Sequence, residues 1–316
     1  MSRKLDIRAI DKSSLKIKAT YFFGITVFLS SIFLSGFDDN PRKDQRNINS
    51  GLNPENSSSS SETKFYHLTN GNLKDLPVEN LTISPLKNII KIPIERRNSN
   101  GSGTSFKIGK DVWITARHVV DGCKNLFLSD KIITRVYIPP SSDLALLVSN
   151  SFSAEQFKLN WTPSDIVKSK HREDSKIGDD AYSIGFPKGQ PGQAHLKFSG
   201  YVQMIQKGSY YLKEPVKMWV EVQRQPRSLD QMGGISGGPI FNKDGAVVGV
   251  HVANSVRRGR AFSVDEYAIS WLIMAASNNQ IPDSPRIERK ISQKNWSEIA
   301  SSWRQKGRIR KVICTI

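Results

Sequence analysis

Three separated segments of the chain contain a histidine, an aspartate and a serine whose neighbours suit nucleophilic catalysis. His118 follows Val-Trp-Ile-Thr-Ala-Arg, Asp143 precedes Leu-Ala-Leu-Leu-Val, and Ser236 lies within Gly-Gly-Ile-Ser-Gly-Gly-Pro. A serine hydroxyl is a poor nucleophile at neutral pH unless a neutral imidazole takes its proton and a carboxylate orients that imidazole. The pattern therefore predicts a triad, with His118 as general base, Asp143 as its orienting partner and Ser236 as nucleophile.

Glycines on both sides of Ser236 predict a tight turn at this position. Four glycines lie within three residues of the serine, so backbone N–H groups can point to one side of the turn. The N–H groups of Gly234 and Ser236 are the candidates for an oxyanion hole. Losing one such donor typically costs about 2.7–4 kcal/mol of transition-state stabilisation.

Short strand-forming runs must position these residues. From about residue 65 onwards, runs rich in β-branched residues alternate with Gly, Pro, Asn and Asp, which favour turns. Many short strands at this spacing are typical of an all-β barrel or sandwich. We expect a β domain over residues 64–276 that a helix at 270–277 closes, and a short helix around 296–303.

An uncharged segment near the N-terminus predicts that the β domain is exported. Residues 19–37 contain no charged side chain, and at about 1.5 Å per residue they just span a hydrocarbon core of roughly 30 Å. Basic residues in 1–18 precede the segment, so we expect the N-terminus in the cytoplasm and the β domain on the periplasmic or extracellular side. No small-residue cleavage pair ends the segment, which favours an uncleaved single-pass anchor; a cleaved signal peptide is the alternative. The polar residues 38–63, with five consecutive serines, predict a flexible linker.

The excess of basic residues is concentrated at the two ends. The chain of 316 residues has 46 Lys and Arg against 29 Asp and Glu, a formal net charge of +17. Residues 1–18 contribute six basic against two acidic side chains, and residues 277–316 contribute nine against three. We expect the second region to be a solvated basic C-terminal tail. No nucleic-acid motif is present, so no nucleic-acid partner is expected.

Metal and cofactor chemistry is not expected from this sequence. Two cysteines exclude a cysteine-rich zinc framework and a disulfide-stapled miniprotein. His67, His171 and His195 have no second ligand at a spacing typical of metal sites. We therefore predict no metal and no cofactor.

Five motifs, spread over residues 88–270, lie at the landmarks of one known family. They are Gly-Ser-Gly-Thr-Ser-Phe at 101–106, Ile-Thr-Ala-Arg-His at 114–118, Asp-Leu-Ala-Leu-Leu at 143–147, Ile-Gly-Phe-Pro at 184–187 and Ser-Gly-Gly-Pro-Ile-Phe-Asn at 236–242. The chain thereby resembles the trypsin-like (chymotrypsin-fold) serine peptidases, in the exported bacterial branch of HtrA protease domains and glutamyl endopeptidases. About forty residues follow the expected barrels, too few for the PDZ domain that HtrA-type relatives append.

The resemblance implies a fold and an activity. The fold would be a double six-stranded β-barrel with the active site in the cleft between the barrels. The activity would be that of a serine endopeptidase, which hydrolyses exported polypeptides through an acyl-enzyme. His118, Asp143 and Ser236 would take the triad roles given above.

Two features depart from this family. Ile235 precedes Ser236, where the family often has Asp or Asn, so activation by pairing of such an Asp with a freed N-terminus is not expected. His118 and Asp143 are 25 residues apart, a short separation that leaves room for two small strands. A catalytically silent barrel that binds peptides or proteins at the membrane is therefore the alternative. A membrane-anchored binder of nucleic acid or another anionic surface is a third interpretation.

Substrate preference depends on residues near Ser236 that have more than one interpretation. His251, fifteen residues after Ser236, matches a histidine of glutamyl endopeptidases and picornaviral main proteases that hydrogen-bonds a substrate Glu or Gln in the S1 pocket. Asp230, next to Gln231 and six residues before Ser236, lies where trypsin has the Asp that pairs with substrate Arg or Lys. Mutual neutralisation of Asp230 and His251 is a further alternative, as is a buried strand histidine bonded to backbone.

The two cysteines lie far apart in the sequence. Cys123 follows His118 by five residues, and Cys314 is third from the C-terminus. In an oxidising compartment they could pair and hold the basic tail against the first barrel. A sequence does not supply the geometry of such a bond, so paired and free cysteines are both open here.

Overall fold

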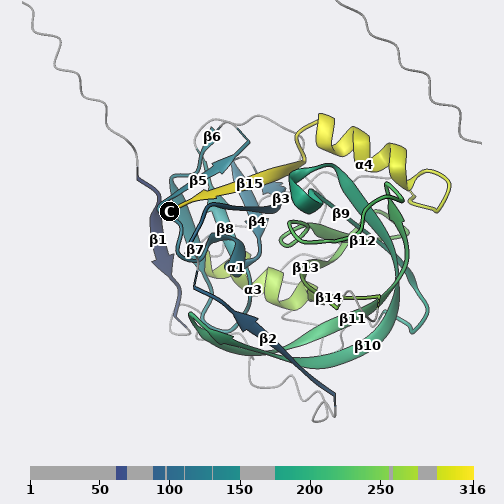
Figure 1. Ribbon diagram of the computed structural model, residues 1–316, viewed down its shortest axis with the longest axis horizontal. Helices are drawn as coiled ribbons and strands as arrows, with labels where there is room; N and C mark the ends of the chain where they lie inside the picture. Colours follow the sequence, from purple (N-terminus) through teal and green to yellow (C-terminus); the bar gives the residue numbers. More distant parts are fainter. Residues whose placement is uncertain are drawn as a thin grey trace, which may run out of the picture. The chain divides into compact units, whose positions relative to one another are not determined.

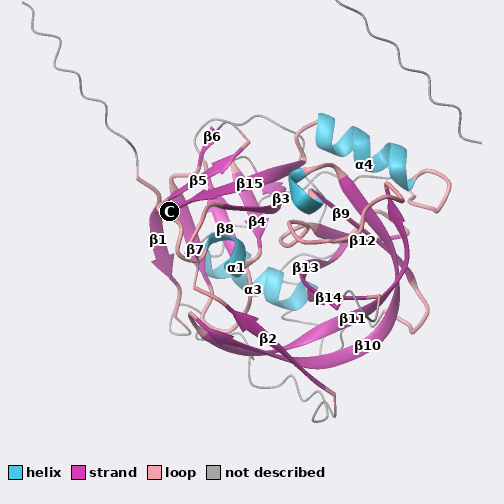
Figure 2. Cartoon of the chain, viewed as in Figure 1, coloured by secondary structure: helices cyan, strands magenta, loops and turns pink. Residues whose placement is uncertain are grey.

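Strands make up most of the part of the chain that the structure describes (Figure 2). The computed structural model describes residues 62–69, 88–96, 98–109, 111–129, 131–149, 175–255, 259–276 and 290–316. Within these ranges the strands form two curled sheets (Figure 1). The observed architecture is therefore mostly β, as the short apolar runs predict.

The first sheet combines strands from the beginning of the domain with one strand from the C-terminus. Its order is β1-β7-β8-β4-β3-β15-β5-β6, and all neighbours are antiparallel except β1 and β7. The bounds are β1 Lys64–His67, β3 Gly101–Gly109, β4 Val112–Thr115, β5 Asn125–Leu128, β6 Lys131–Ile132, β7 Arg135–Ile138, β8 Ala145–Val148 and β15 Ile309–Thr315. Alternation of side chains puts Leu126 and Leu128 of β5, and Val136 and Ile138 of β7, in the core.

The second sheet closes on itself. Its order is β11-β14-β13-β12-β9-β10-β2, and β10 also pairs with β11, so six strands form a ring with β2 outside it. The bounds are β2 Ile89–Ile94, β9 Asp180–Gly185, β10 Gly192–Gly208, β11 Tyr211–Gln225, β12 Pro239–Asn242, β13 Val247–Ser255 and β14 Arg260–Val264. Register shifts at His195/Leu196 and Phe198/Gly200 interrupt the β10–β11 pairing. Bulges of this kind let a long strand bend around a barrel.

Short helices connect and cover the sheets. They are α1 Arg117–Val120, the 3-10 turn η3 Pro187–Gly189, α3 Glu266–Ala276 and α4 Trp296–Gln305. Helix α3 buries Ile269, Leu272 and Ile273 and contacts β8 of the first sheet and β13 of the second. The closing helix predicted at 270–277 is confirmed, beginning four residues earlier, and α4 confirms the helix predicted around 296–303.

The C-terminal residues differ from the solvated tail that the sequence predicts. Trp303 of α4 packs on Phe241 of β12, with ring centroids 4.5 Å apart, and β15 then enters the first sheet between β3 and β5. Ile309, Val312 and Cys314 are fully buried there. The domain therefore does not end at residue 276. The expectation of a tail rested on the net charge of this region and overlooked the alternating apolar residues that make β15 a core strand.

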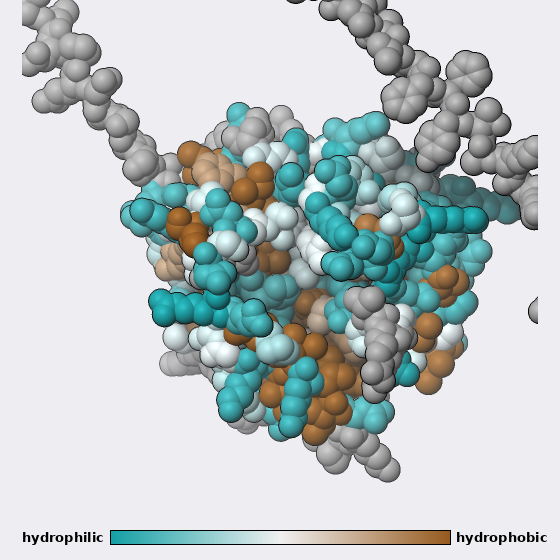
Figure 3. All heavy atoms as spheres, viewed as in Figure 1, coloured by the Kyte–Doolittle hydropathy of each residue, from teal (hydrophilic) through white to brown (hydrophobic). Residues whose placement is uncertain are grey.

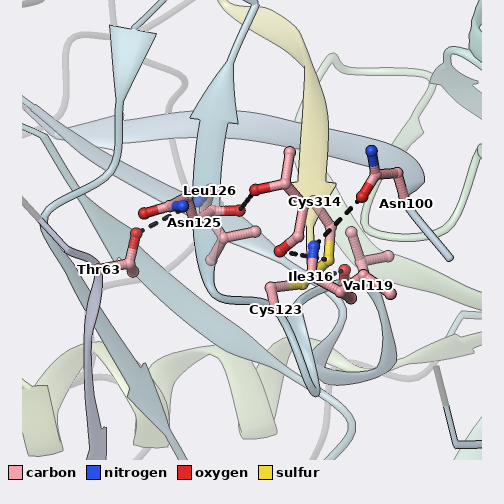
Figure 4. The surroundings of a disulfide bond; sticks show 9 residues. Thr63, Asn100, Val119, Cys123, Asn125, Leu126, Cys314 and Ile316 are labelled. Carbon is pink, nitrogen blue, oxygen red and sulfur yellow. Dashed lines mark hydrogen bonds between the residues drawn. A yellow bond between two sulfur atoms is a disulfide. The ribbon is translucent and has the colours of Figure 1, made fainter. Parts of the chain in front are cut away.

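A disulfide joins Cys123, just after α1, to Cys314 in β15 (Figure 4). The two Cα atoms are 5.5 Å apart, and the bond joins residues that are 191 positions apart in the sequence. Around it, the N–H of Lys124 donates to the carbonyl of Thr315 (2.7 Å), and the N–H of Ile316 donates to the side chain of Asn100 (3.2 Å). The end of the chain is thus tied to the segment that follows His118.

The predicted N-terminal segments lie outside the described ranges. These are the basic residues 1–18, the uncharged residues 19–37 and nearly all of the linker 38–63. Among the helices that the structure does describe, none is long and apolar enough to cross a membrane. The anchor at 19–37 stays a prediction.

Polar side chains cover much of the visible face of the protein, and apolar ones gather near β2, β10 and β11 (Figure 3). Among the large apolar side chains of these strands, Ile89, Tyr211 and Val222 are the most exposed. Apolar atoms are common on the surface of folded proteins. We assign this area no partner.

Replacement of Cys314 tests the tie between β15 and α1. A disulfide stabilises mainly by restricting the unfolded chain, more so for a long loop. We expect Cys314→Ala to lower the free energy of unfolding of residues 58–316 by about 3–5 kcal/mol, measured by urea denaturation. The matched control is the Cys123→Ala/Cys314→Ala protein, which should lose little more. Equal stability of wild type and Cys314→Ala would show that the bond does not form in solution.

Candidate active site

His118 and Asp143 form a hydrogen-bonded pair. His118 lies in α1, which begins directly after β4, and Asp143 lies just before β8. The imidazole Nδ1 is 2.8 Å from Oδ2 of Asp143, and the backbone N–H of His118 donates to Oδ1 (3.0 Å). Because a carboxylate only accepts, a neutral ring carries its proton on Nδ1, and its proton-accepting lone pair is then on Nε2. The histidine side chain is 23% exposed, whereas that of Asp143 is fully buried.

The chain between these two residues forms more structure than expected. The sequence predicts room for two small strands, but α1 is followed by the three strands β5, β6 and β7 before Asp143. β6 is only two residues long, and the turns are tight. The short separation of 25 residues therefore does not prevent the pair from forming.

The Ser236 turn packs against the strand and helix that hold His118. The N–H of Thr104 in β3 donates to the carbonyl of Ser236 (2.8 Å). Gly237 has a φ of +85°, and a Cβ there would lie 2.1 Å from the Thr104 carbonyl oxygen and 2.8 Å from the N of Ala116. Only glycine fits this position. The turn is thereby pressed against Ala116, two residues before His118.

The N–H groups of Gly234 and Ser236, which the sequence predicts for an oxyanion hole, lie at this turn. Gly234 has a φ of +96°; its carbonyl accepts from Thr104 Oγ1 (2.8 Å), and that of Gly233 accepts from the N–H of Lys188 (2.6 Å). A planar trans peptide then directs the N–H of Gly234 away from Lys188. In the described part of the chain, no hydrogen bond uses the N–H of Gly234 or Ser236. Both N–H groups can therefore donate to a new acceptor.

Ile235 has a packing role. Its side chain is fully buried and lies in an apolar cluster with Ala181, Met232 and Ile240. A carboxylate at this position would be buried among apolar groups at a high cost. The departure from the family pattern is therefore accounted for by the core of the second barrel.

His251 is a buried residue with a partner on each ring nitrogen. Nδ1 is 2.9 Å from Ser183 Oγ and Nε2 is 2.8 Å from Asn254 Oδ1. Burial lowers the pKa of His251 to about 4, so the ring is neutral at pH 7. Its backbone carbonyl accepts from the N–H of Gly237 (2.7 Å). This matches the expected buried strand histidine: its ring contacts the side chains of Ser183 and Asn254, and a backbone hydrogen bond with Ala253 also acts on its pKa.

Asp230 and Gln231 lie on the surface. Asp230 pairs with Lys188, with Oδ1 2.8 Å from Nζ, and its side chain is 65% exposed. The hydrogen bond from Lys188 lowers the pKa of Asp230. Gln231 is exposed. Asp230 and His251 therefore have different partners, and the proposed neutralisation of one by the other is wrong.

Three residues that the sequence analysis did not identify contact the Asp143 segment. They lie in the β10–β11 hairpin: Gln206 Nε2 donates to Asp143 Oδ2 (2.7 Å), and Tyr210 Oη donates to Oδ1 (3.3 Å). Glu214 Oε1 accepts from the N–H of Asp143 (2.8 Å), and Oε2 accepts from Ser142 Oγ (2.8 Å). The available sequence signal was a glutamate at an inward position of β11, between the buried Leu212 and Val216.

Electrostatics around the hairpin favour neutral side chains. Burial raises the pKa of Glu214 well above its usual range, and the charge of Asp143 raises it further. Burial, followed by the charge of Asp143, also raises the pKa of Tyr210. The guanidinium of Arg117 lies 3.9 Å from the centroid of the Tyr210 ring. The two hairpin side chains that donate to Asp143, Gln206 and Tyr210, are therefore neutral donors.

Within the described ranges, no group of three or more His, Cys, Asp or Glu is arranged to hold a metal ion. His195 instead places Nε2 2.8 Å from Oδ1 of Asp180.

One protein-family model, described as the trypsin-like peptidase domain, matches part of the chain. Residues 101–250 thus match a trypsin-like peptidase domain. Its fold is mostly β and chymotrypsin-like, with two curled sheets. His118, Asp143 and Ser236 fall within the match, and α4 and β15 of the peptidase domain lie beyond it.

Solved structures also resemble the chain. The active form of the Rv3671c protease from M. tuberculosis is 20% identical, over 57% of this chain and 76% of that chain, with a TM-score of 0.43. The HtrA-type protease AlgW with a decapeptide is 17% identical, over 57% and 53%, with a TM-score of 0.40. The murine norovirus NS6 protease is 19% identical, over 52% and 88%, with a TM-score of 0.36. Likenesses at this level assign no residue and no substrate, and no curated protein matches the sequence.

The depressed pKa of His251 predicts a loss of stability in acid. A histidine of the unfolded chain takes up a proton near pH 6.5, whereas His251 in the folded state does so only near pH 4. Between these values the unfolded state binds more protons, so stability falls as the pH falls, by up to about 3 kcal/mol. Urea denaturation of residues 58–316 at pH 7, 5.5 and 4 measures this loss.

His251→Gln isolates the contribution, because glutamine can donate to Asn254 and accept from Ser183 without titrating. The variant should lose less stability between pH 7 and 4 than wild type. His67→Gln, at an exposed position, is the matched control and should follow wild type. Parallel curves for wild type and His251→Gln would contradict the assignment.

Proposed function

We propose that the peptidase domain is a serine endopeptidase that hydrolyses exported polypeptides through an acyl-enzyme. The observation that carries this proposal is the His118–Asp143 pair, with Nδ1 2.8 Å from Oδ2. It leaves Nε2 of a correctly oriented imidazole able to accept a proton. The nucleophile is Ser236. Its glycine-rich turn packs against Ala116, which is two residues before His118 in the sequence.

The reaction follows from these groups. Ser236 Oγ attacks the carbonyl carbon of the scissile peptide bond while Nε2 of His118 takes the hydroxyl proton. The resulting imidazolium is stabilised by Asp143 and returns the proton to the leaving amine as the C–N bond breaks. Water then attacks the acyl-enzyme, again with His118 as base, and the acid product and free Ser236 are released.

The oxyanion of each tetrahedral intermediate needs hydrogen-bond donors that are already in place. The N–H groups of Gly234 and Ser236 are the donors we assign to it. Their position is fixed by the hydrogen bonds of Thr104 and Lys188 to neighbouring carbonyls of the same turn. Since these bonds are made within the protein, the donors need not reorganise as negative charge develops.

Export of the domain is part of the proposal. The uncharged residues 19–37, preceded by basic residues, suit a single-pass anchor with the N-terminus in the cytoplasm. The Cys123–Cys314 disulfide supports an oxidising location for the domain, since such bonds are rare in the cytosol. The substrates would then be polypeptides on the exported side of the membrane.

A fluorophosphonate probe tests the triad, because it reacts with an activated serine and not with an ordinary one. We expect the purified full chain to be labelled at Ser236, as located by mass spectrometry, and Ser236→Ala to be unlabelled. Peptide hydrolysis should fall roughly 10⁴-fold or more in Ser236→Ala.

Cleavage of peptides with Glu, Gln, Arg or Lys before the scissile bond then defines the preference of the S1 pocket. Ser301→Ala, at an exposed serine of α4, controls for nonspecific labelling and should still react at Ser236. A folded wild-type protein that reacts with no probe would favour the silent, peptide-binding barrel.

Membrane topology is tested by expressing the full chain in bacteria with a C-terminal tag. We expect the protein to stay in the membrane after alkaline carbonate extraction. Protease added to spheroplasts should remove the C-terminal domain, because that domain lies on the exported side. N-terminal sequencing distinguishes an uncleaved anchor from a signal peptide. A C-terminal tag protected from external protease would contradict the proposed orientation.

A further inference from the structure

The β10–β11 hairpin reaches from the second barrel to the first. Its strands pair from Gln193 and Gln225 to Lys207 and Tyr211, and the pair sweeps around the molecule toward the side of the first sheet (Figure 1). Near its tip, side chains of the hairpin touch the segment that leads into β8. The triad aspartate therefore lies between α1 of the first barrel and a hairpin of the second.

The carboxylate of Asp143 receives two hydrogen bonds from this hairpin and two from His118. Gln206 donates to Oδ2 at 2.7 Å, on the oxygen that also contacts the imidazole. Tyr210 donates to Oδ1 at 3.3 Å, on the oxygen that also accepts the backbone N–H of His118. Each carboxylate oxygen is thus held from both barrels. Hydrogen bonds to a charged acceptor are stronger than those between neutral groups.

The backbone of the same segment is held by Glu214. Its carboxyl group accepts the N–H of Asp143 and the hydroxyl of the neighbouring Ser142, both at 2.8 Å. Glu214 is 4% exposed and has no cationic partner among the described residues. It therefore acts through hydrogen bonds and geometry, because a second negative charge beside Asp143 would be unfavourable.

We propose that Gln206, Tyr210 and Glu214 are positioning residues for peptide hydrolysis, which set the orientation of Asp143 and through it that of His118. The inference rests on the proposed serine-peptidase function. It adds a specific dependence of the triad on the second barrel. The Tyr210 ring also lies on Arg117, the neighbour of His118, so movement of the hairpin tip changes both sides of the pair.

The test compares Tyr210→Phe with Tyr211→Phe in the full chain purified in detergent. Tyr210→Phe keeps the ring on Arg117 and removes only the donor to Asp143, whereas Tyr211 is 64% exposed and is the matched control. We expect kcat to fall roughly ten-fold in Tyr210→Phe with little change in KM, and no change in Tyr211→Phe. Gln206→Leu, which removes the other donor, should act in the same direction.

The pH profile separates positioning from a general loosening of the fold. Without the hydrogen bond from Tyr210, the negative charge of the Asp143 carboxylate is less dispersed. Asp143 then stabilises protonated His118 more strongly, which raises the pKa of the imidazole. The acid limb of kcat/KM should therefore move to higher pH in Tyr210→Phe. Among the described residues, the other titratable groups that act on Tyr210, Glu214 or His118 include Arg117, Asp121, Asp265 and His251, and they are unchanged in these variants. A lower rate with an unmoved acid limb would overturn the proposal.

Glu214 is tested by two substitutions. Glutamine can accept the N–H of Asp143 and donate to Ser142, whereas alanine does neither. We expect Glu214→Ala to lose roughly ten-fold in kcat and Glu214→Gln to recover most of that loss. Equal losses in both variants would show that the charge of Glu214 matters and would overturn this part of the proposal. If Glu214→Ala does not fold, the proposal is tested by the kcat and pH profile of Tyr210→Phe and by the kcat of Glu214→Gln.

Failure of this inference is distinguishable from failure of the proposed function. If the chain is not a serine peptidase, wild type is not labelled by fluorophosphonate at Ser236. If only the inference is wrong, wild type is labelled and hydrolyses peptides, and the hairpin variants share its kcat and its pH profile.

Discussion

The buried carboxylate of Asp143 is the constraint around which the site is built. A charged group without exposed surface must be surrounded by hydrogen-bond donors, since the cost of leaving it unpaired is far larger than the gain from any single contact. Its donors come from α1 of the first barrel and from the β10–β11 hairpin of the second. Neither barrel satisfies Asp143 alone. The orientation of His118 therefore depends on how the two barrels meet.

A second point of convergence is Thr104 in β3. Its N–H donates to the carbonyl of Ser236, its hydroxyl donates to that of Gly234, and its own carbonyl accepts from Thr115 Oγ1 at 2.7 Å. β3 is in turn paired with β15, where Lys311 lies opposite Thr104. The C-terminal strand thus supports the strand that holds the Ser236 turn. The disulfide fixes that strand to the segment after α1.

The parts of this arrangement that the sequence predicts are those with local patterns. Alternating apolar runs predicted the β architecture, and the glycines around Ser236 predicted a turn whose Gly237 has a positive φ. The role of β15 could not be predicted, because pairing residues some 200 positions apart leaves no local trace and the basic composition suggested a tail. Gln206 and Tyr210 were missed for the same reason. Ser183, one partner of His251, likewise lies on another strand, β9.

Asp143 and Glu214 are neighbouring buried carboxyl groups, and two negative charges so close together would repel each other. The contacts of the two side chains differ in a way that avoids this repulsion. Asp143 has four donors, one of them an imidazole that becomes cationic during the proposed reaction. Glu214 meets one backbone N–H and a hydroxyl, and burial raises its pKa. The neutral form of Glu214 is therefore favoured, which avoids a second negative charge beside Asp143. Environments that separate the charge states of neighbouring carboxyl groups are a general way to assign distinct roles to chemically similar side chains. Here Asp143 orients the imidazole of His118, and Glu214 supports the backbone that carries Asp143.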